Sequence, residues 1–103
     1  IPGGLLNPKE TPQDAALREC FEETGVKCKN PRLLINYNPD LEYTRNYTHV
    51  FYTDEIEQVP TENLGKFVWI PLEECIKMIF EKKISDSLSL ISILSYKFIQ
   101  SQK

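Results

Sequence analysis

Residues 4–26 read GLLNPKETPQDAALRECFEETGV, and this stretch decides how the rest of the chain is interpreted. Thr11 can cap a helix, Pro12 suits the first helical position, and Gly25 is a common residue just beyond a helix end. The stretch therefore predicts a glycine-containing loop, followed by a helix that begins near Thr11 and stops at Gly25.

The predicted helix carries three carboxylates on one side. At about 100° per residue, Glu19, Glu22 and Glu23 share a face. Like charges at these spacings repel by a few tenths of a kcal/mol, and the helix dipole disfavours anions in the C-terminal half by about 0.3–1 kcal/mol each. Mg²⁺ prefers carboxylate oxygens and would remove this conflict. The opposite arc is predicted to be buried, and it holds Ala16, Leu17, Cys20, Phe21 and Thr24.

An acidic helix face is most often simply solvated, but the spacing here is specific. Gly4, Glu10 and the run from Arg18 to Val26 resemble the Nudix box, G-x5-E-x7-R-E-U-x-E-E-x-G-U, where U is aliphatic. The one departure is Cys20 at the first U position, and cysteine behaves as a small hydrophobic residue. The chain is similar to Nudix hydrolases from this loop to its C-terminus.

The resemblance implies a fold and an activity. The fold is α/β (α+β), a Nudix-type α/β/α sandwich with a mixed sheet, formed by a single domain over residues 1–103. The implied activity is Mg²⁺- or Mn²⁺-dependent hydrolysis of a diphosphate linkage in a nucleoside diphosphate joined to another moiety. The expected partner is thus a small nucleotide diphosphate.

The resemblance also implies roles for particular residues. Arg18 would orient Glu19 and pair with Glu10, which is structural in the motif like Gly25. The metal ligands would be Glu19, Glu22, Glu23 and the carbonyl of Gly3. The catalytic residues would be Arg18, Glu22, Glu23 and Glu62. Substrate binding is assigned to Gly4, Lys9, Tyr37 and Arg45.

The general base is left open by the sequence. Nudix enzymes use either a glutamate of the box or one from a later loop. Here the predicted loop over residues 58–65 offers Glu62, and Glu55 and Glu57 lie close to it in the sequence. We expect Glu62 to be the base.

The substrate is also left open. Residues 37–41, YNPDL, resemble the proline-containing loop of ADP-ribose and nucleotide-sugar pyrophosphatases, which favours that class. Diphosphoinositol polyphosphates and dinucleoside polyphosphates are the alternatives, but such anionic substrates call for more Lys and Arg than the sequence offers near the site. A catalytically silent module that binds a nucleotide or a protein is a further alternative.

Composition excludes several other classes. A net charge of −3 on 103 residues argues against a nucleic-acid partner. Three cysteines without a C-x-x-C pair argue against a disulfide framework or a thiolate zinc site, and we expect reduced thiols in a cytoplasmic protein. The apolar run over residues 84–99 is interrupted by serines, Asp86 and Lys97, so no membrane span is expected.

The remaining elements follow from hydrophobic periodicity. We expect strands at 32–37, 45–57 and 66–70, with Trp69 in the core, and helices at about 72–82 and 86–100. The sequence opens on Ile1-Pro2-Gly3-Gly4, where a Nudix domain normally has preceding strands. Either strands upstream are missing from the sequence, or a homodimer partner completes the sheet, or one edge stays open.

Overall fold

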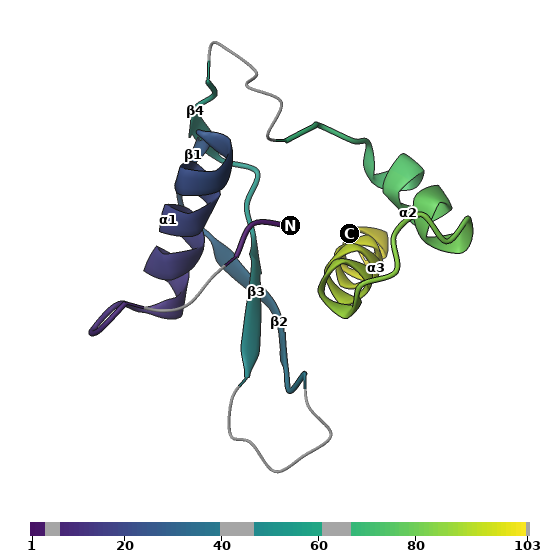
Figure 1. Ribbon diagram of the computed structural model, residues 1–103, viewed down its shortest axis with the longest axis horizontal. Coiled ribbons are helices and arrows are strands. Elements are labelled where there is room, and N and C mark those ends of the chain that lie inside the picture. Colours follow the sequence, from purple (N-terminus) through teal and green to yellow (C-terminus); the bar gives the residue numbers. More distant parts are fainter. Residues whose placement is uncertain (4–6, 40–46, 61–66, 103) are drawn as a thin grey trace. The chain divides into compact units, whose positions relative to one another are not determined.

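The computed structural model describes residues 1–3, 7–39, 47–60 and 67–102. Helices and short strands follow one another in an α+β arrangement, as the sequence predicts (Figure 1). The described strands pair two by two, β1 with β4 and β2 with β3. The elements are α1 (Pro12–Thr24), β1 (Lys27–Cys28), β2 (Arg32–Tyr37), β3 (Thr48–Tyr52), β4 (Ile56–Gln58), α2 (Leu72–Phe80) and α3 (Ser87–Ser101).

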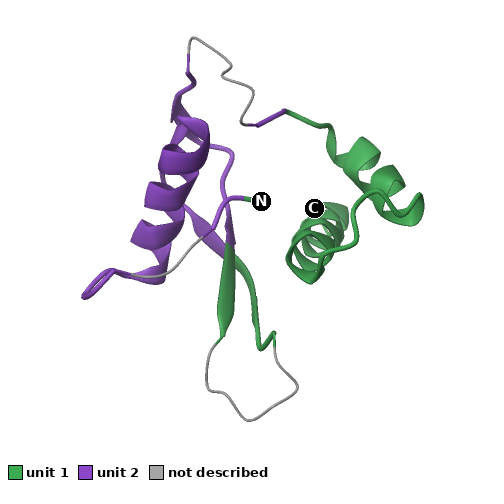
Figure 2. Cartoon of the chain, viewed as in Figure 1, with its two compact units in different colours: residues 1, 34–50, 69–103 green, residues 2–33, 51–68 purple. Residues whose placement is uncertain are grey.

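The chain divides into two compact units (Figure 2). Unit 1 comprises Ile1, residues 34–50 and residues 69–103, and it contains α2 and α3. Unit 2 comprises residues 2–33 and 51–68, and it contains α1 together with the β1–β4 sheet.

In unit 2, α1 begins and ends where its capping residues predict. The Thr11 hydroxyl accepts a hydrogen bond from the backbone N–H of Asp14 at 3.1 Å, and Pro12 occupies the first turn. Gly25 ends the helix at φ 76°, a left-handed conformation, and its N–H donates to the Phe21 carbonyl at 2.8 Å. The helix bounds expected from the sequence are therefore confirmed.

The face of α1 that packs differs from the expected one. Ala15 is the buried residue of the helix, with 6% of its surface exposed, whereas Phe21 is 51% exposed. The predicted burial of Phe21 was wrong, because the wheel gives only the angular position of a residue and not which part of the helix a neighbouring element covers. Val26, which follows the Gly25 cap, is the other buried apolar residue among the described residues of this unit.

The sheet of unit 2 is a short antiparallel pair that the sequence only partly indicates. Lys27 pairs with Gln58 and Cys28 with Ile56, so a bulge leaves Glu57 as the extra residue. β1 was not expected, because two residues carry no periodicity. The Lys29 N–H continues the contact by donating to the Glu55 carbonyl at 3.0 Å.

The long strand predicted over residues 45–57 is instead two strands. β3 and β4 are separated by Thr53, whose hydroxyl donates to the Lys29 carbonyl at 2.7 Å and accepts from the Glu55 N–H at 3.0 Å. Side-chain hydrogen bonds of this kind replace the strand ladder, so the strand ends there. The start predicted at residue 45 lies outside the described residues.

The strand predicted over residues 66–70 is absent from the part that the structure describes, residues 67–70. Trp69 is 64% exposed, so its predicted place in the core is also wrong. A strand needs a partner for its backbone groups, and this segment joins neither of the two sheets. The β-propensity of these residues is not enough to form a strand when no pairing strand is present.

In unit 1, α2 and α3 pack against each other. Lys97 of α3 forms an ion pair with Glu73 of α2, and Asp86 caps α3 by accepting from the Ser89 N–H at 2.9 Å. α2 stops two residues before the predicted end, because Lys82 turns the chain at φ 63°. Within the described residues, neither of these helices nor α1 is long and apolar enough to cross a membrane.

Candidate metal and active site

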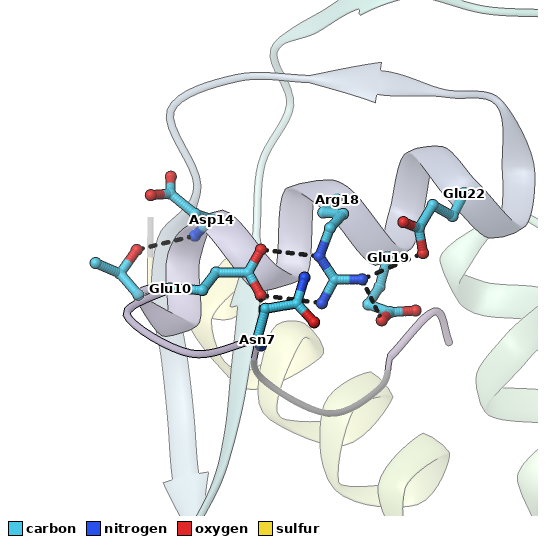
Figure 3. A network of polar contacts seen from close by, with 7 residues as sticks. Asn7, Glu10, Asp14, Arg18, Glu19 and Glu22 are labelled. Carbon is cyan, nitrogen blue, oxygen red and sulfur yellow. Dashed lines mark hydrogen bonds and ion pairs between the residues drawn. The ribbon is translucent and has the colours of Figure 1, made fainter.

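The loop before α1 holds Glu10 in place through two reciprocal hydrogen bonds with Asn7. The Glu10 N–H donates to the Asn7 carbonyl at 3.1 Å, and the Asn7 N–H donates to the Glu10 carboxylate at 3.0 Å. The turn directs the Glu10 carboxylate along α1 toward Arg18 (Figure 3). The sequence did not lead us to single out Asn7, although asparagine is a common residue in turns of this kind.

Arg18 is the centre of this network (Figure 3). Its Nε and Nη2 donate to the two oxygens of Glu10, at 2.8 and 3.0 Å, which is a bidentate pair. Its Nη1 lies 2.7 Å from a carboxylate oxygen of Glu19 and 3.2 Å from one of Glu22. The ion pair expected between Glu10 and Arg18 is present, and one guanidinium holds three carboxylates.

The electrostatics of the network follow from these contacts. The pKa of Glu10 lies below its ordinary value, first because Arg18 hydrogen-bonds to the carboxylate and second because the Asn7 N–H does. Reciprocally, the hydrogen bonds to Glu10 and then to Glu19 raise the pKa of Arg18. Both shifts favour the charged forms of Glu10 and Arg18, so this pair is ionised at neutral pH.

Glu23 lies outside the Arg18 contacts and meets the N-terminal loop instead. One of its carboxylate oxygens accepts a hydrogen bond from the Gly3 N–H at 3.2 Å. This brings together two of the predicted metal ligands, but the group of Gly3 that makes the contact is its N–H and not its carbonyl. The contact joins the loop to the last turn of α1.

The carboxylates differ in how much solvent they meet. The side chains of Glu10 and Glu19 are 14% and 15% exposed, whereas that of Glu22 is 53% exposed. Glu10 and Glu19 are therefore largely shielded from solvent, whereas the Glu22 carboxylate is accessible to a ligand.

In this arrangement no three His, Cys, Asp or Glu side chains of the described residues are gathered closely enough to hold a metal ion. The donor set nevertheless fits a hard divalent cation. Glu19 and Glu22 already converge on one cationic nitrogen, and Glu23 stands on the same helix within one turn. Three carboxylates contact the single guanidinium of Arg18, so the network keeps an excess of negative charge that a divalent cation would neutralise.

The other predicted site residues are distributed differently. Lys9 is exposed at φ 65° in the turn before α1, in the same unit as the carboxylates. Tyr37 ends β2 and belongs to unit 1. Gly4, Arg45 and Glu62 lie outside the described residues.

Glu55 and Glu57, the other candidates for the general base, each contact another side chain. The Glu55 carboxylate accepts from the Asn30 side-chain amide at 3.1 Å. Glu57, the bulge residue, lies 3.5 Å from the Lys27 ammonium. These contacts support the sheet and give neither residue a link to α1.

Comparison with known proteins places these features in context. A family model described as "NUDIX domain" matches residues 1–88. The chain is 39% identical over 84 residues to a bovine (Bos taurus) diphosphoinositol polyphosphate phosphohydrolase 3-beta, covering 77% of this chain and 51% of that protein. It is 41% identical over 83 residues to a human (Homo sapiens) diphosphoinositol polyphosphate phosphohydrolase 2, covering 77% of this chain and 46% of that protein.

A bacterial relative matches over a longer part of the chain. The CMP-5'-(N-acetyl-N-hydroxy-3-aminopropyl)phosphonate hydrolase of Streptomyces rubellomurinus is 31% identical over 99 residues, covering 92% of this chain and 48% of that protein. The chain thus spans about half the length of the curated relatives it matches.

Proposed function

This chain belongs to the Nudix family, and from that premise we propose that it hydrolyses a diphosphate linkage in a small anionic substrate. The observation that carries the proposal is the convergence of Glu19 and Glu22 on one nitrogen of Arg18, at 2.7 and 3.2 Å. Two carboxylates held to one point, with Glu23 beside them on α1, provide oxygen ligands of the kind that Mg²⁺ and Mn²⁺ prefer.

The residues of the chain have distinct roles in this proposal. Glu19, Glu22 and Glu23 hold Mg²⁺ or Mn²⁺, and Arg18 keeps Glu19 in position. The bound ion supplies neutralisation of the diphosphate charge and activation of water. A glutamate then takes the proton of the attacking water, and we retain Glu62 as the candidate for that role.

For the substrate, the relatives support diphosphoinositol polyphosphates over the ADP-ribose or nucleotide-sugar class that the sequence favoured. Two of the proteins compared are named as diphosphoinositol polyphosphate phosphohydrolases, at 39% and 41% identity. A nucleotide-linked diphosphate remains the second candidate, because the bacterial relative that covers 92% of the chain is named for a CMP-linked substrate.

A hydrolysis screen tests both candidates. The chain is incubated with a diphosphoinositol pentakisphosphate, ADP-ribose, a sugar nucleotide and a CMP-linked phosphonate, with Mg²⁺, with Mn²⁺ and with EDTA. We expect release of phosphate from the diphosphoinositol substrate in the presence of metal and none with EDTA. Faster cleavage of a nucleotide substrate would favour the second candidate, and metal binding without any product would favour a silent module.

Replacement of the exposed ligands tests the site itself. We expect Glu22→Gln or Glu23→Gln to lower kcat by a factor of about 10² or more, because each removes a charged ligand that acts in the transition state. The matched control is Glu74→Gln, an exposed carboxylate on α2, which should turn over like the wild type. Normal turnover in both α1 variants would refute the assignment.

A further inference from the structure

Arg18 holds three carboxylates with unequal strength. Glu10 receives two hydrogen bonds, from Nε at 2.8 Å and from Nη2 at 3.0 Å, whereas Glu19 and Glu22 share the single nitrogen Nη1. The Glu19 oxygen lies 2.7 Å from Nη1 and the Glu22 oxygen lies 3.2 Å from it, the longest of these contacts (Figure 3). Glu22 is therefore the carboxylate that the guanidinium holds least tightly.

Solvent weakens the Glu22 contact further. The Glu22 side chain is 53% exposed, while those of Glu10 and Glu19 are 14% and 15% exposed. Arg18 and Glu22 stand four residues apart on one helix, and an exposed ion pair of this kind contributes little to stability. Since little is lost when the pair breaks, the Glu22 side chain can take another partner.

The proposed metal ligands are not gathered around one point. Glu22 reaches along α1 to Arg18, one turn nearer the N-terminus, whereas Glu23 accepts a hydrogen bond from the Gly3 N–H at 3.2 Å. Across the described part of the chain, no three His, Cys, Asp or Glu side chains lie close enough together to hold a metal ion. Gathering the ligands therefore requires side chains to move, and of the carboxylates on Arg18, Glu22 can leave most easily.

A divalent cation and the guanidinium repel each other when both use the same carboxylate oxygen. Mg²⁺ binds oxygen at about 2.0–2.1 Å. A cation on the Glu22 oxygen that contacts Nη1 would therefore lie within about 5 Å of a positively charged group. Arg18 and the cation thus compete for this oxygen.

Given the proposed function, which places a divalent cation on α1, we propose that Glu22 leaves Arg18 to bind that cation, while Glu10 and Glu19 keep their contacts with the guanidinium. Glu19 can serve both partners, because its Oε1 meets Nη1 and its second oxygen can coordinate the cation. Arg18 then has two opposed effects on the site. It positions Glu19, and it competes with the cation for Glu22.

NMR spectroscopy of the arginine side chains tests this exchange without measuring activity. The ¹⁵N-labelled chain is titrated with Mg²⁺ at constant ionic strength, and the side-chain N–H signals of Arg18 are assigned by correlation with its backbone. We expect an Nη1 proton signal to shift in step with the backbone amides of α1, because this proton loses the Glu22 acceptor. The Nε signal should stay in place, because Nε continues to donate to Glu10.

The possible outcomes separate the exchange from the proposed function. If the α1 amides shift and Nη1 does not, the cation binds while Glu22 stays on Arg18, and the exchange alone is refuted. Shifts at both Nε and Nη1 would also overturn the exchange, since the contact with Glu10 would then be lost as well. If Mg²⁺ moves no signal of α1, the proposed function fails, and the exchange fails with it.

Matched variants exclude a direct effect of the charge of the cation. In Glu22→Gln the exchanging carboxylate is gone, so Mg²⁺ concentrations that shift the α1 amides should leave Nη1 unchanged. A shift at Nη1 as large as that in the wild type would show that the nearby charge is its cause, and would overturn the proposal. Glu74→Gln, which removes an exposed carboxylate from α2, should reproduce the wild-type titration.

Discussion

Glu10 shows how one side chain can order a site without being exposed to a ligand. Its carboxylate is 14% exposed, and it receives two hydrogen bonds from Arg18 and one from the Asn7 N–H. Because Arg18 is anchored in this way, its remaining Nη1 is held where it meets Glu19 and Glu22. Glu10 therefore acts on the carboxylate face through the guanidinium.

The lowered pKa of Glu10 makes a prediction about stability and pH. A carboxylate whose folded pKa lies below the ordinary 4.5 stabilises the protein above that value, and it loses this contribution as the pH falls through the folded pKa. We expect Glu10→Gln to be less stable than the wild type at pH 7, and the difference to shrink as the pH falls below about 4.5. Urea unfolding of both proteins across this range measures it.

The control uses the partner that causes the shift. In an Arg18→Met background, Glu10→Gln should cost much less stability at pH 7, because the hydrogen bonds from the guanidinium are already gone. A pH dependence of equal size in both backgrounds would show that Arg18 is not the cause.

At this scale the sequence predicts some contacts and not others. The pairing of Glu10 with Arg18 follows from the motif, since both residues stand at fixed positions in it. The Gly3 N–H contact to Glu23 could not be predicted, because it depends on how the loop folds back.

The turn after α1 depends on the backbone conformation of one glycine. Gly25 adopts φ 76°, and a Cβ placed there would lie 3.3 Å from the Pro60 side chain. An L-residue in this conformation costs about 1–2 kcal/mol. We expect Gly25→Ala to lower the free energy of unfolding by about that amount or more, measured by urea denaturation.

The double variant separates strain from crowding. Pro60→Ala removes the Cγ and Cδ atoms that lie 3.4 and 3.8 Å from the added Cβ. Gly25→Ala should therefore cost less in a Pro60→Ala background than in the wild type, with the backbone part of the cost remaining. An unchanged cost would mean that the crowding is relieved by small shifts of Pro60.

Among the elements, the predictions that succeeded have local causes. α1 was predicted at both ends because Thr11 and Gly25 act on neighbouring backbone groups. The strand predicted over residues 66–70 failed because a strand is stabilised by a partner distant in the sequence, and hydrophobic pattern does not identify that partner. Thr53 likewise interrupts a periodic segment through a contact with Lys29 that no local rule contains.

For the whole molecule, charge is the property that a metal ion would change most. The chain has a net charge of −3, and any divalent cation will be weakly attracted to it. Specific binding must therefore be distinguished from general screening. The proposed ligands all lie on α1 in unit 2, whereas α2 in unit 1 has its own group of acidic residues.

Thermal unfolding in the presence of Mn²⁺ makes this distinction. A ligand that binds only the folded chain stabilises it by about 2.7 kcal/mol at a hundred times its Kd. We expect Mn²⁺ to raise the Tm of the wild type and to leave a variant with glutamine at positions 19, 22 and 23 unchanged. A variant with glutamine at positions 73, 74 and 81 loses the same charge from α2 and its C-terminal cap, so it should respond as the wild type does. If both variants lost the response equally, the cation would be acting on net charge, and the carboxylate face of α1 would not be its site.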